Sequence, residues 1–361
     1  MMMKMKMKQR RAVLISLIFG SFVFLTGCGG NQQPSFGENT TSGSNPEATP
    51  KMTLTIAHTG AEDSMNQFVS LRLKEKIEAK SNKNITVQVY PSGQLGSDKD
   101  LIRSSLAGDV TFHVCSTGPL VNDVPGAGVI DIPFLLKDVK MARQVVNDPE
   151  FKSLFEKEFE KAGFKLMMTT DQGFRQLSTN KKITKIDDLK GMKIRTMENK
   201  NHINFWGDLG VNATPLNFAE VYVSLQQGLL DGQENPYNII YGSKFNEVQK
   251  YVTNSNHIFH LMTVTMSQNV FNKLPDAYKT IVTESMSEVA DMAAAESDRS
   301  TGEYLQKLTS SGVEYIDFDK IPGMRDELIK RTSKSIDRVK TTVNPQLVDA
   351  FVKAVEKASG K

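Results

Sequence analysis

The stretch from Asp276 to Ser310 constrains the fold of this chain more than any other feature. It contains no proline, and its only glycine is Gly302. Proline breaks helices and glycine weakens them, so the stretch predicts one helix far longer than the average of about 11 to 12 residues. We expect a helix of this length to run across two lobes as a strut. Two helices with a kink near Gly302, or two packed helices joined by a turn, are the alternatives.

The rest of the chain alternates between strand and helix patterns. Met52, Leu54 and Ile56 alternate with polar residues, as in a half-buried strand, and apolar residues recur at helical spacing between 65 and 77. Further strands are predicted near 85–89, 110–114, 165–169, 175–179 and 192–196, and further helices near 98–106, 201–209 and 217–230. Asn217 and Glu220 fit a capping box at the start of the last of these helices. This order favours an α/β fold with mostly parallel strands and helices on both faces.

The first 27 residues have the pattern of a bacterial signal peptide. Basic residues between 4 and 11 precede an apolar run over 12–25, which is shorter than the about 20 residues of a spanning helix. The segment LTGC at 25–28 resembles a lipobox, in which the cysteine is lipidated and becomes the mature N-terminus. We therefore expect residues 1–27 to be removed and Cys28 to carry a lipid anchor. An ordinary cleaved signal peptide with an incidental cysteine is the alternative.

Without the signal peptide, the chain is nearly neutral. Residues 28–361 contain 39 Lys and Arg against 41 Asp and Glu, a formal charge of −2, and no basic stripe suggests nucleic acid. Residues 28–50 are rich in small and polar residues, which predicts a flexible tether. The remaining length exceeds what one core usually supports, so two lobes are expected. We assign 51–172, about 261–300 and part of the C-terminal helices to lobe I, and 173–260 with about 301–327 to lobe II.

Sequence templates for catalysis and metal binding are absent. The five histidines show no zinc-ligand spacing, so we expect neither a metal nor a cofactor. Asp231 and Glu234 could form an acid–base pair, although a polar turn around Gly232 is the simpler interpretation. Cys115 lies in an apolar strand pattern and is expected to be a small buried side chain without a disulfide partner.

Arg175, Arg195 and Asn235 together could form a receptor for a carboxylate. An arginine can hold a carboxylate with a planar fork of charged donors. Pro236 biases Asn235 toward an extended backbone and so restricts where its amide points. Taken singly, each arginine is more often a surface or ion-paired residue, so the interpretation depends on the combination.

Longer segments containing these residues resemble a known family, the substrate-binding subunits of tripartite ATP-independent periplasmic (TRAP) transporters, in the dicarboxylate-binding DctP-type branch. The resemblance covers nearly the whole chain after the tether and implies a two-lobe periplasmic-binding-protein-like fold with a long helix across both lobes. Its strongest element is VSLQQGLLDGQENP. The other segments are GFRQLSTN, GMKIRTMEN, SNKNITVQVYPSGQLGSDKDLI and DIPFLLKD.

The resemblance implies a role for each matching residue of the second lobe. Arg195 corresponds to the arginine that binds the ligand carboxylate, and Arg175 to a second arginine near the same group. Asn235 corresponds to an asparagine that hydrogen-bonds the carboxylate, and Phe218 to an aromatic residue that packs on the ligand.

Four further candidate ligand contacts accompany them. Thr59 and Ser116 fall in first-lobe loops that would close over the ligand, and His58 adjoins Thr59. These two loop positions hold a longer amide and a carboxylate in the sialate-binding pattern, so the resemblance does not extend to sialic acid. Glu198, after Arg195, could accept a hydroxyl of a sugar acid.

The resemblance therefore implies a monomeric, extracytoplasmic, lipid-anchored solute-binding protein without enzymatic activity. It would capture a small organic acid, such as a C4-dicarboxylate, a hexuronate or another sugar acid, and deliver it to the TRAP permease subunits in the membrane. A binding lipoprotein of an ATP-driven importer, a sensory receptor, and a hydrolase using Asp231 and Glu234 are the alternatives.

Overall fold

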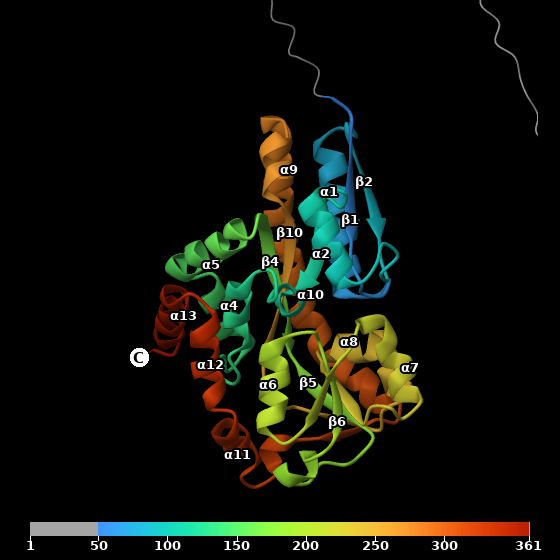
Figure 1. Cartoon of the computed structure of the whole chain (residues 1–361). Helices are drawn as coiled ribbons and strands as arrows, with labels where there is room; N and C mark the ends of the chain where they lie inside the picture. The colour runs from blue at the N-terminus through green and yellow to red at the C-terminus, as the bar shows by residue number, and fades with distance from the viewer. Residues whose placement is uncertain (1–49, 361) are drawn as a thin grey trace, which may run out of the picture. The chain divides into compact units, whose positions relative to one another are not determined.

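The computed structural model describes residues 50–360, which form two α/β lobes (Figure 1). The first lobe is built around a five-stranded sheet of order β2-β1-β3-β10-β4, and the second around a six-stranded sheet of order β11-β9-β5-β8-β6-β7. The predicted signal peptide, Cys28 and all of the tether except Pro50 lie outside the described residues. Within 50–360, no helix is both long and apolar enough to cross a membrane.

The first lobe follows the predicted strand–helix order. Its strands are β1 (Met52–Ala57), β2 (Ile85–Tyr90), β3 (Phe112–Ser116), β4 (Phe164–Phe174) and β10 (Phe259–Ser267). Its helices before the long helix are α1 (Met65–Lys80), α2 (Asp98–Ala107), α3 (Thr117–Leu120), η1 (Pro125–Asp131), α4 (Val139–Val146), α5 (Pro149–Lys161) and α9 (Gln268–Lys273). Ser64 caps α1, and Ser97 with Asp100 forms a capping box on α2, so both helices begin where their side chains satisfy free N–H groups.

The second lobe contains shorter elements. Its strands are β5 (Gln176–Thr179), β6 (Lys193–Thr196), β7 (Asn212–Pro215), β8 (Gly232–Asn235), β9 (Tyr251–Thr253) and β11 (Glu314–Ile316). Its helices are η2 (Ile186–Leu189), α6 (Lys200–Asp208), η3 (Phe218–Glu220), α7 (Val221–Gln226), α8 (Tyr237–Gly242), η4 (Phe245–Glu247) and η5 (Phe318–Lys320). The helix predicted over 217–230 is thus shorter than expected. Asn217 forms no side-chain cap, so the predicted capping box is wrong.

Both sheets are mixed rather than mostly parallel. β1 runs parallel to β2 and β3, and β6 runs parallel to β7 and β8. By contrast, β10 is antiparallel to β3 and β4, and β5 is antiparallel to β8 and β9. The antiparallel strands β4, β5, β9 and β10 flank the points where the chain passes between the sheets. Of these, β5 and β10 enter their sheets directly from the other lobe instead of through a crossover helix, which parallel strands require.

The long helix is continuous. α10 (Asp276–Ser310) has 35 residues and spans about 52 Å at 1.5 Å per residue. Its first half packs Tyr278, Val282 and Met286 into the core of the first lobe, while Leu308 near its end packs into the core of the second. The predicted strut across both lobes is therefore confirmed, and the alternatives with two helices are wrong.

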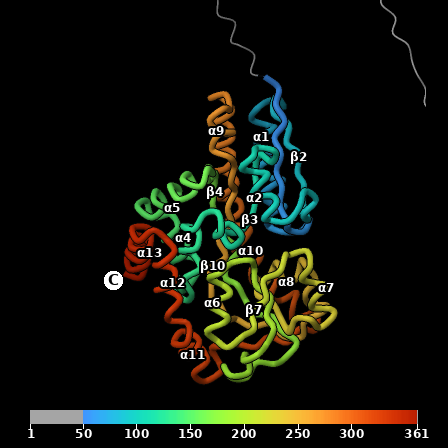
Figure 2. The backbone as a smooth tube through the Cα atoms, in the orientation of Figure 1, coloured from blue at the N-terminus to red at the C-terminus, as the bar shows by residue number. Residues whose placement is uncertain are grey.

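Two short connections in the middle of the chain also cross between the lobes (Figure 2). β4 ends at Phe174 and β5 begins at Gln176, while β9 ends at Thr253 and β10 begins at Phe259. The backbone N–H of Arg175 donates to Ile258 O at 2.9 Å, so the two connections lie side by side. The predicted lobe limits near 173 and 260 fall close to these connections, but the exact boundaries remain a prediction.

The C-terminal helices return to the first lobe. α11 (Met324–Arg331) packs Met324 and Leu328 into a core of the second lobe. α13 (Pro345–Ala358) packs against α4 and α5 of the first lobe through a phenylalanine-rich core, while α12 (Lys334–Thr342) lies against η1 of the first lobe and α6 of the second. Each sheet is consequently covered on both faces, and the two lobes have separate cores.

The absence of a side chain at Gly232 allows β8 to approach β5 closely. A Cβ at position 232 would lie 2.3 Å from the backbone oxygen of Ser178, whereas a Cβ at Gly302 would meet no atom within 4 Å. We expect Gly232→Ala to lower the free energy of unfolding by about 1–3 kcal/mol or more, because backbone cannot yield as a flexible side chain can. Gly302→Ala, the control, should raise it by roughly 0.5–1 kcal/mol through helix propensity. Urea denaturation measures both, and a Gly232→Ala variant as stable as wild type would contradict this close approach.

Candidate functional site

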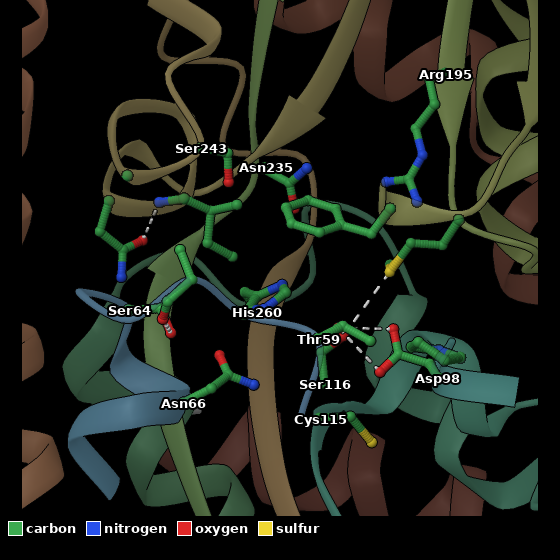
Figure 3. Close-up of a pocket in the computed structure, with 18 residues that line it drawn as sticks. Thr59, Ser64, Asn66, Asp98, Cys115, Ser116, Arg195, Asn235, Ser243 and His260 are labelled. Atoms are coloured by element: carbon green, nitrogen blue, oxygen red, sulfur yellow. Dashed lines mark hydrogen bonds between the residues drawn. The ribbon is translucent and has the colours of Figure 1, made fainter. Parts of the chain in front are cut away.

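A pocket lies between the two sheets and encloses about 620 Å³ of empty space, part of it open to solvent. The place suits a small molecule, because ligand sites are usually concave and often lie at the interface between domains. Its walls come from segments at the carboxyl ends of parallel strands in both lobes, where α/β sheets bind ligands (Figure 3). The lining residues are Thr59, Gly60, Ala61, Ser64, Asn66, Asp98, Cys115, Ser116, Pro119, Arg195, Met197, Phe218, Asn235, Asn238, Ile239, Gly242, Ser243 and His260.

Arg195, on β6, contributes an incompletely bonded guanidinium to the pocket wall. Its side chain is almost completely buried, and Nε and Nη2 donate to Leu216 O at 2.9 and 2.7 Å. Nη1 is buried and has no hydrogen-bond partner among the residues that the structure describes. Burial lowers the pKa of Arg195 to about 10, so the group is still charged at neutral pH. Because burying an unpaired charge is costly, an anionic partner at Nη1 would be stabilising.

Two neighbours shape the surroundings of Arg195. The Phe218 ring lies beside the guanidinium, with 5.7 Å between the Arg195 Cζ and the ring centroid. Asn235, at the end of β8, lines the same pocket. Its Oδ1 accepts from Arg175 Nη2 at 3.0 Å, and its Nδ2 donates to Gln233 Oε1 at 2.6 Å. These two hydrogen bonds therefore fix the orientation of the Asn235 amide.

The structure does not place Arg175 on the pocket wall, which corrects the expectation that both arginines contact a ligand directly. Arg175 is 1% exposed and lies in the connection between β4 and β5. Its Nε and Nη2 bond the carboxylate of Glu234, and Nη1 bonds His260 Nδ1 at 2.6 Å. Its Nε, Nη1 and Nη2 are thus each bonded to protein groups, and the main partner, Glu234, lies 59 residues away in the sequence.

Glu234 is the centre of a buried polar cluster rather than half of an acid–base pair. It is fully buried and contacts Arg175, His202 Nδ1 at 3.4 Å and His257 Nε2 at 2.9 Å. Burial alone would raise the pKa of Glu234, but the charge of Arg175 and the bonds from both histidines hold it well below its ordinary value. Asp231 instead bonds Lys181 and the backbone of Lys193 at the other end of β8. The two acids form no common site.

The ring of His260 has a defined protonation state. Burial and the neighbouring Arg175 hold the pKa of His260 well below 6.5, so the ring is neutral. A guanidinium can only donate hydrogen bonds, so Nδ1 of His260 accepts and its proton lies on Nε2. Since His260 lines the pocket, Nε2–H is a further donor at this wall.

A second branch of the cluster reaches the first lobe. His202 Nε2 lies 3.1 Å from Asp131 Oδ1, while Asp131 Oδ2 accepts from Asn199 at 2.8 Å and from Asn201 at 3.1 Å. Burial opposes a charge on His202, but Asp131 and Glu234 outweigh burial and raise the pKa of His202 to about 9. A buried imidazolium therefore joins a carboxylate of each lobe.

The first-lobe wall carries one acid, Asp98, at the start of α2. Its carboxylate accepts from Thr59 Oγ1 at 3.1 and 3.2 Å and lies 3.3 Å from His113 Nε2. Thr59 and Ser116 line the pocket as predicted from the sequence. His58 does not: it is fully buried, and its Nε2 is 2.9 Å from Gln67 Oε1. The position of His58 directly after β1 directs its ring into the interior of the first lobe.

Glu198 lies outside this pocket, contrary to expectation. It lines an adjoining, more open pocket, which shares Asp98, Arg195 and Met197 with the first. The Glu198 backbone oxygen accepts from Asn122 of the first lobe at 2.8 Å. The turn after β6 therefore uses its backbone for an inter-lobe contact and leaves the Glu198 carboxylate exposed.

Sequence reasoning missed several lining residues. Asp98 had a signal, since it follows the loop at the carboxyl end of β2 and starts a capped helix. Asn66, Asn238 and Ser243 lie within or beside helices, and His260 lies inside an apolar strand. Only the tertiary structure brings these side chains to one cavity.

Cys115 also lines the pocket and is buried, as expected for a strand thiol. Among residues 50–360, no group of three or more His, Cys, Asp or Glu side chains is arranged to hold a metal ion.

Comparisons with known proteins place these features in context. The family model for bacterial extracellular solute-binding proteins, family 7 (DctP), matches residues 56–334. A solute-binding protein from Verminephrobacter eiseniae is 32% identical over 271 residues, which cover 75% of this chain and 81% of that protein. The C4-dicarboxylate-binding periplasmic protein DctP from Rhodobacter capsulatus is 29% identical over 270 residues, covering 74% and 80%.

A solved structure agrees with the fold along most of the chain. The sugar-acid-binding protein from Advenella mimigardefordensis, in complex with galactonate, matches with a TM-score of 0.81 and 28% identity. The match covers 86% of this chain and 99% of that one. The two-lobe α/β fold predicted from the sequence is thereby confirmed.

The raised pKa of His202 makes stability depend on pH. A histidine with a folded pKa of about 9 and an ordinary pKa of 6.5 stabilises fully below pH 6.5 and loses this contribution as the pH rises to 9. We expect the stability difference between wild type and His202→Gln to shrink by about 3 kcal/mol over this interval. Urea denaturation at a series of pH values measures it. The control His58→Gln should show no such change above pH 7, because burial lowers the pKa of His58. A difference that stays constant for His202→Gln would show that His202 is neutral.

Proposed function

Because this chain belongs to family 7 of the bacterial extracellular solute-binding proteins, the DctP-type substrate-binding subunits of TRAP transporters, we propose that it captures a small organic acid. The observation that carries this proposal is the buried Nη1 of Arg195, which has no partner in the described residues although the guanidinium lines the pocket. A ligand carboxylate there would accept a charge-assisted hydrogen bond, which is among the stronger kinds. Asn235 and the Nε2–H of His260 are further proposed contacts.

Arg175 has a positioning role in this proposal. It holds the Oδ1 of Asn235 and the Nδ1 of His260, and so directs their remaining N–H donors toward the pocket. Its own charge is balanced by Glu234. The ligand would thus meet donors that are already oriented, which reduces the ordering cost of binding.

Ligand binding would favour closure of the lobes. Arg195, Phe218 and Asn235 line the pocket from the second lobe, while Thr59 and Ser116 line it from the first. A ligand touching both walls interacts better with a closed arrangement than with an open one, which is what a ligand-driven switch requires. The short connections near Arg175 and Ile258 are the proposed hinges.

Delivery to the TRAP permease subunits, driven by an ion gradient, completes the proposal. No chemical step on the ligand is included. Uptake into vesicles that carry the membrane subunits should then need this protein and the gradient, and uptake that ATP alone can drive would contradict it.

Arg195→Ala should weaken binding about thirtyfold or more, since losing one partner of a buried charged pair costs about 2–5 kcal/mol. The fold should remain, because the Arg195 side chain bonds only Leu216 O within the described protein. Arg175→Ala should instead destabilise the protein by about 3–5 kcal/mol, because it leaves Glu234 charged and buried. A thermal-shift screen of organic acids identifies ligands, and calorimetry then measures their affinity. The control is Arg103→Ala, which removes an arginine from the second pocket only and should bind like wild type. Equal affinity of wild type and Arg195→Ala for the acids found would contradict the proposed site.

The anchor is the remaining part of the proposal. The family is extracytoplasmic, and we place this protein on the outer face of a membrane through a lipid on Cys28, with 29–50 as tether. Wild-type protein should fractionate with membranes and carry a diacylglycerol by mass spectrometry. Cys28→Ala should lose both properties, and an unmodified Cys28 in membrane-bound protein would rule out lipidation.

A further inference from the structure

A buried carboxylate of the first lobe has its hydrogen-bond partners in the second lobe. Asp131, the last residue of η1, is 3% exposed. Its Oδ2 accepts from Asn199 and Asn201, and its Oδ1 lies 3.1 Å from His202 Nε2. Within the described part of the chain, no group of the first lobe bonds this carboxylate. The three partners therefore compensate its burial only while the lobes are together.

Two further hydrogen bonds join the same segments of the chain. Asn122 Nδ2 donates to Glu198 O at 2.8 Å, and Asn199 Nδ2 donates to Gly118 O at 3.2 Å. We call the contact between residues 118–131 of the first lobe and 198–202 of the second the inter-lobe latch. Each of these bonds runs from one lobe to the other, so each must break if the two segments separate.

Two glycines of the first lobe allow the latch segments to approach closely. A Cβ at Gly128 would lie 2.7 Å from Asn201 Nδ2, and a Cβ at Gly118 would lie 2.3 Å from Met197 Cε. Both of these neighbours belong to the second lobe. The two surfaces are therefore fitted to each other in the arrangement that the structure describes.

The latch continues directly from the two walls of the pocket. Ser116 and Pro119 line the pocket from the first lobe. Arg195 and Met197 line it from the second, a few residues before the latch begins. Asp131 itself does not line the pocket. A movement that separates the pocket walls would thus separate the latch segments too, although Asp131 does not touch the ligand site.

We propose that Asp131 is a positioning residue for ligand capture, which stabilises the closed arrangement of the lobes and so sets the affinity for every ligand without contacting any of them. This inference rests on the proposed function, in which closure accompanies capture. An apparent dissociation constant equals the intrinsic constant divided by the fraction of protein in the binding-competent state. Loss of the latch lowers this fraction, so it weakens all ligands by one common factor. A residue that contacts the ligand changes the affinities of different acids unequally.

Asp131→Ala in the full-length chain tests the latch. Its three partners then lack an acceptor while the lobes are closed, whereas water can solvate them once the lobes separate. Nitroxide labels on cysteines that replace the exposed Leu71 and Val223, one on each lobe, report the distance between the lobes by pulsed electron paramagnetic resonance. Cys28→Ala removes one native thiol, and Cys115 is buried. Without added ligand, the closed-to-open ratio should fall at least about tenfold in Asp131→Ala.

Calorimetry with two chemically different probes, D-galactonate and succinate, measures the effect on binding. Each probe that binds wild type should bind Asp131→Ala at least about tenfold more weakly. Where both bind, the two factors should agree within about twofold. Asp123→Ala is the matched control, because it removes an exposed carboxylate of the same segment that takes no part in the inter-lobe bonds. It should match wild type in both measurements.

Asn122→Ala keeps the test decisive if thermal melting shows that Asp131→Ala does not fold. Asn122 is exposed and contributes one bond to the latch. Its removal should shift the closed-to-open ratio in the same direction by about threefold.

The outcomes separate the two proposals. Distance distributions that match wild type, or affinities that are unchanged or fall by unequal factors, would overturn this inference and leave the proposed function standing. If no carboxylic acid binds the wild-type protein, the proposed function fails, and the distance measurement alone then decides whether the latch holds the lobes together.

Discussion

The buried ion pair between Arg175 and Glu234 is the interaction on which the rest of the site depends. Arg175 lies in one connection between the lobes, and His257 lies in the other. Glu234, at the end of β8, bonds both residues, so one carboxylate ties the two connections to the second sheet. Burying a carboxylate is costly, and only the surrounding guanidinium and imidazole groups make it tolerable. The cluster therefore fixes the geometry from which the pocket is built.

This arrangement divides the two arginines into different roles. Arg175 is bonded to Glu234, Asn235 and His260, while Arg195 bonds only a backbone oxygen and keeps Nη1 without a partner among the described residues. A site with two uncompensated arginines would carry more charge than a monoanion could balance. Because Glu234 balances one of them, the proposed site offers a ligand one uncompensated arginine.

The long helix and the separate cores are compatible with the proposed closure of the lobes. α10 packs into the core of the first lobe with its beginning and into the core of the second near its end. Between the cores, the contacts include the polar group of Asp131, Asn199 and His202, together with an aromatic contact between Phe134 and Phe205, whose ring centroids are 5.9 Å apart. Polar contacts of this kind can be exchanged for water, whereas a continuous apolar core cannot be separated at low cost.

From the sequence alone, the strand–helix alternation of the first lobe up to β3, the continuous helix over 276–310 and five residues of the pocket wall could be predicted, because hydrophobic periodicity and strand ends are local properties. Those five, Thr59, Ser116, Arg195, Phe218 and Asn235, line the pocket, although their roles toward a ligand remain predictions. The tertiary structure decided the rest. Whether Arg175 is unpaired, whether His58 turns inward, and whether Asp98 and His260 share a cavity depend on residues remote in the chain. Charge balance in a buried cluster is set by such neighbours, and no local pattern in the sequence specifies them.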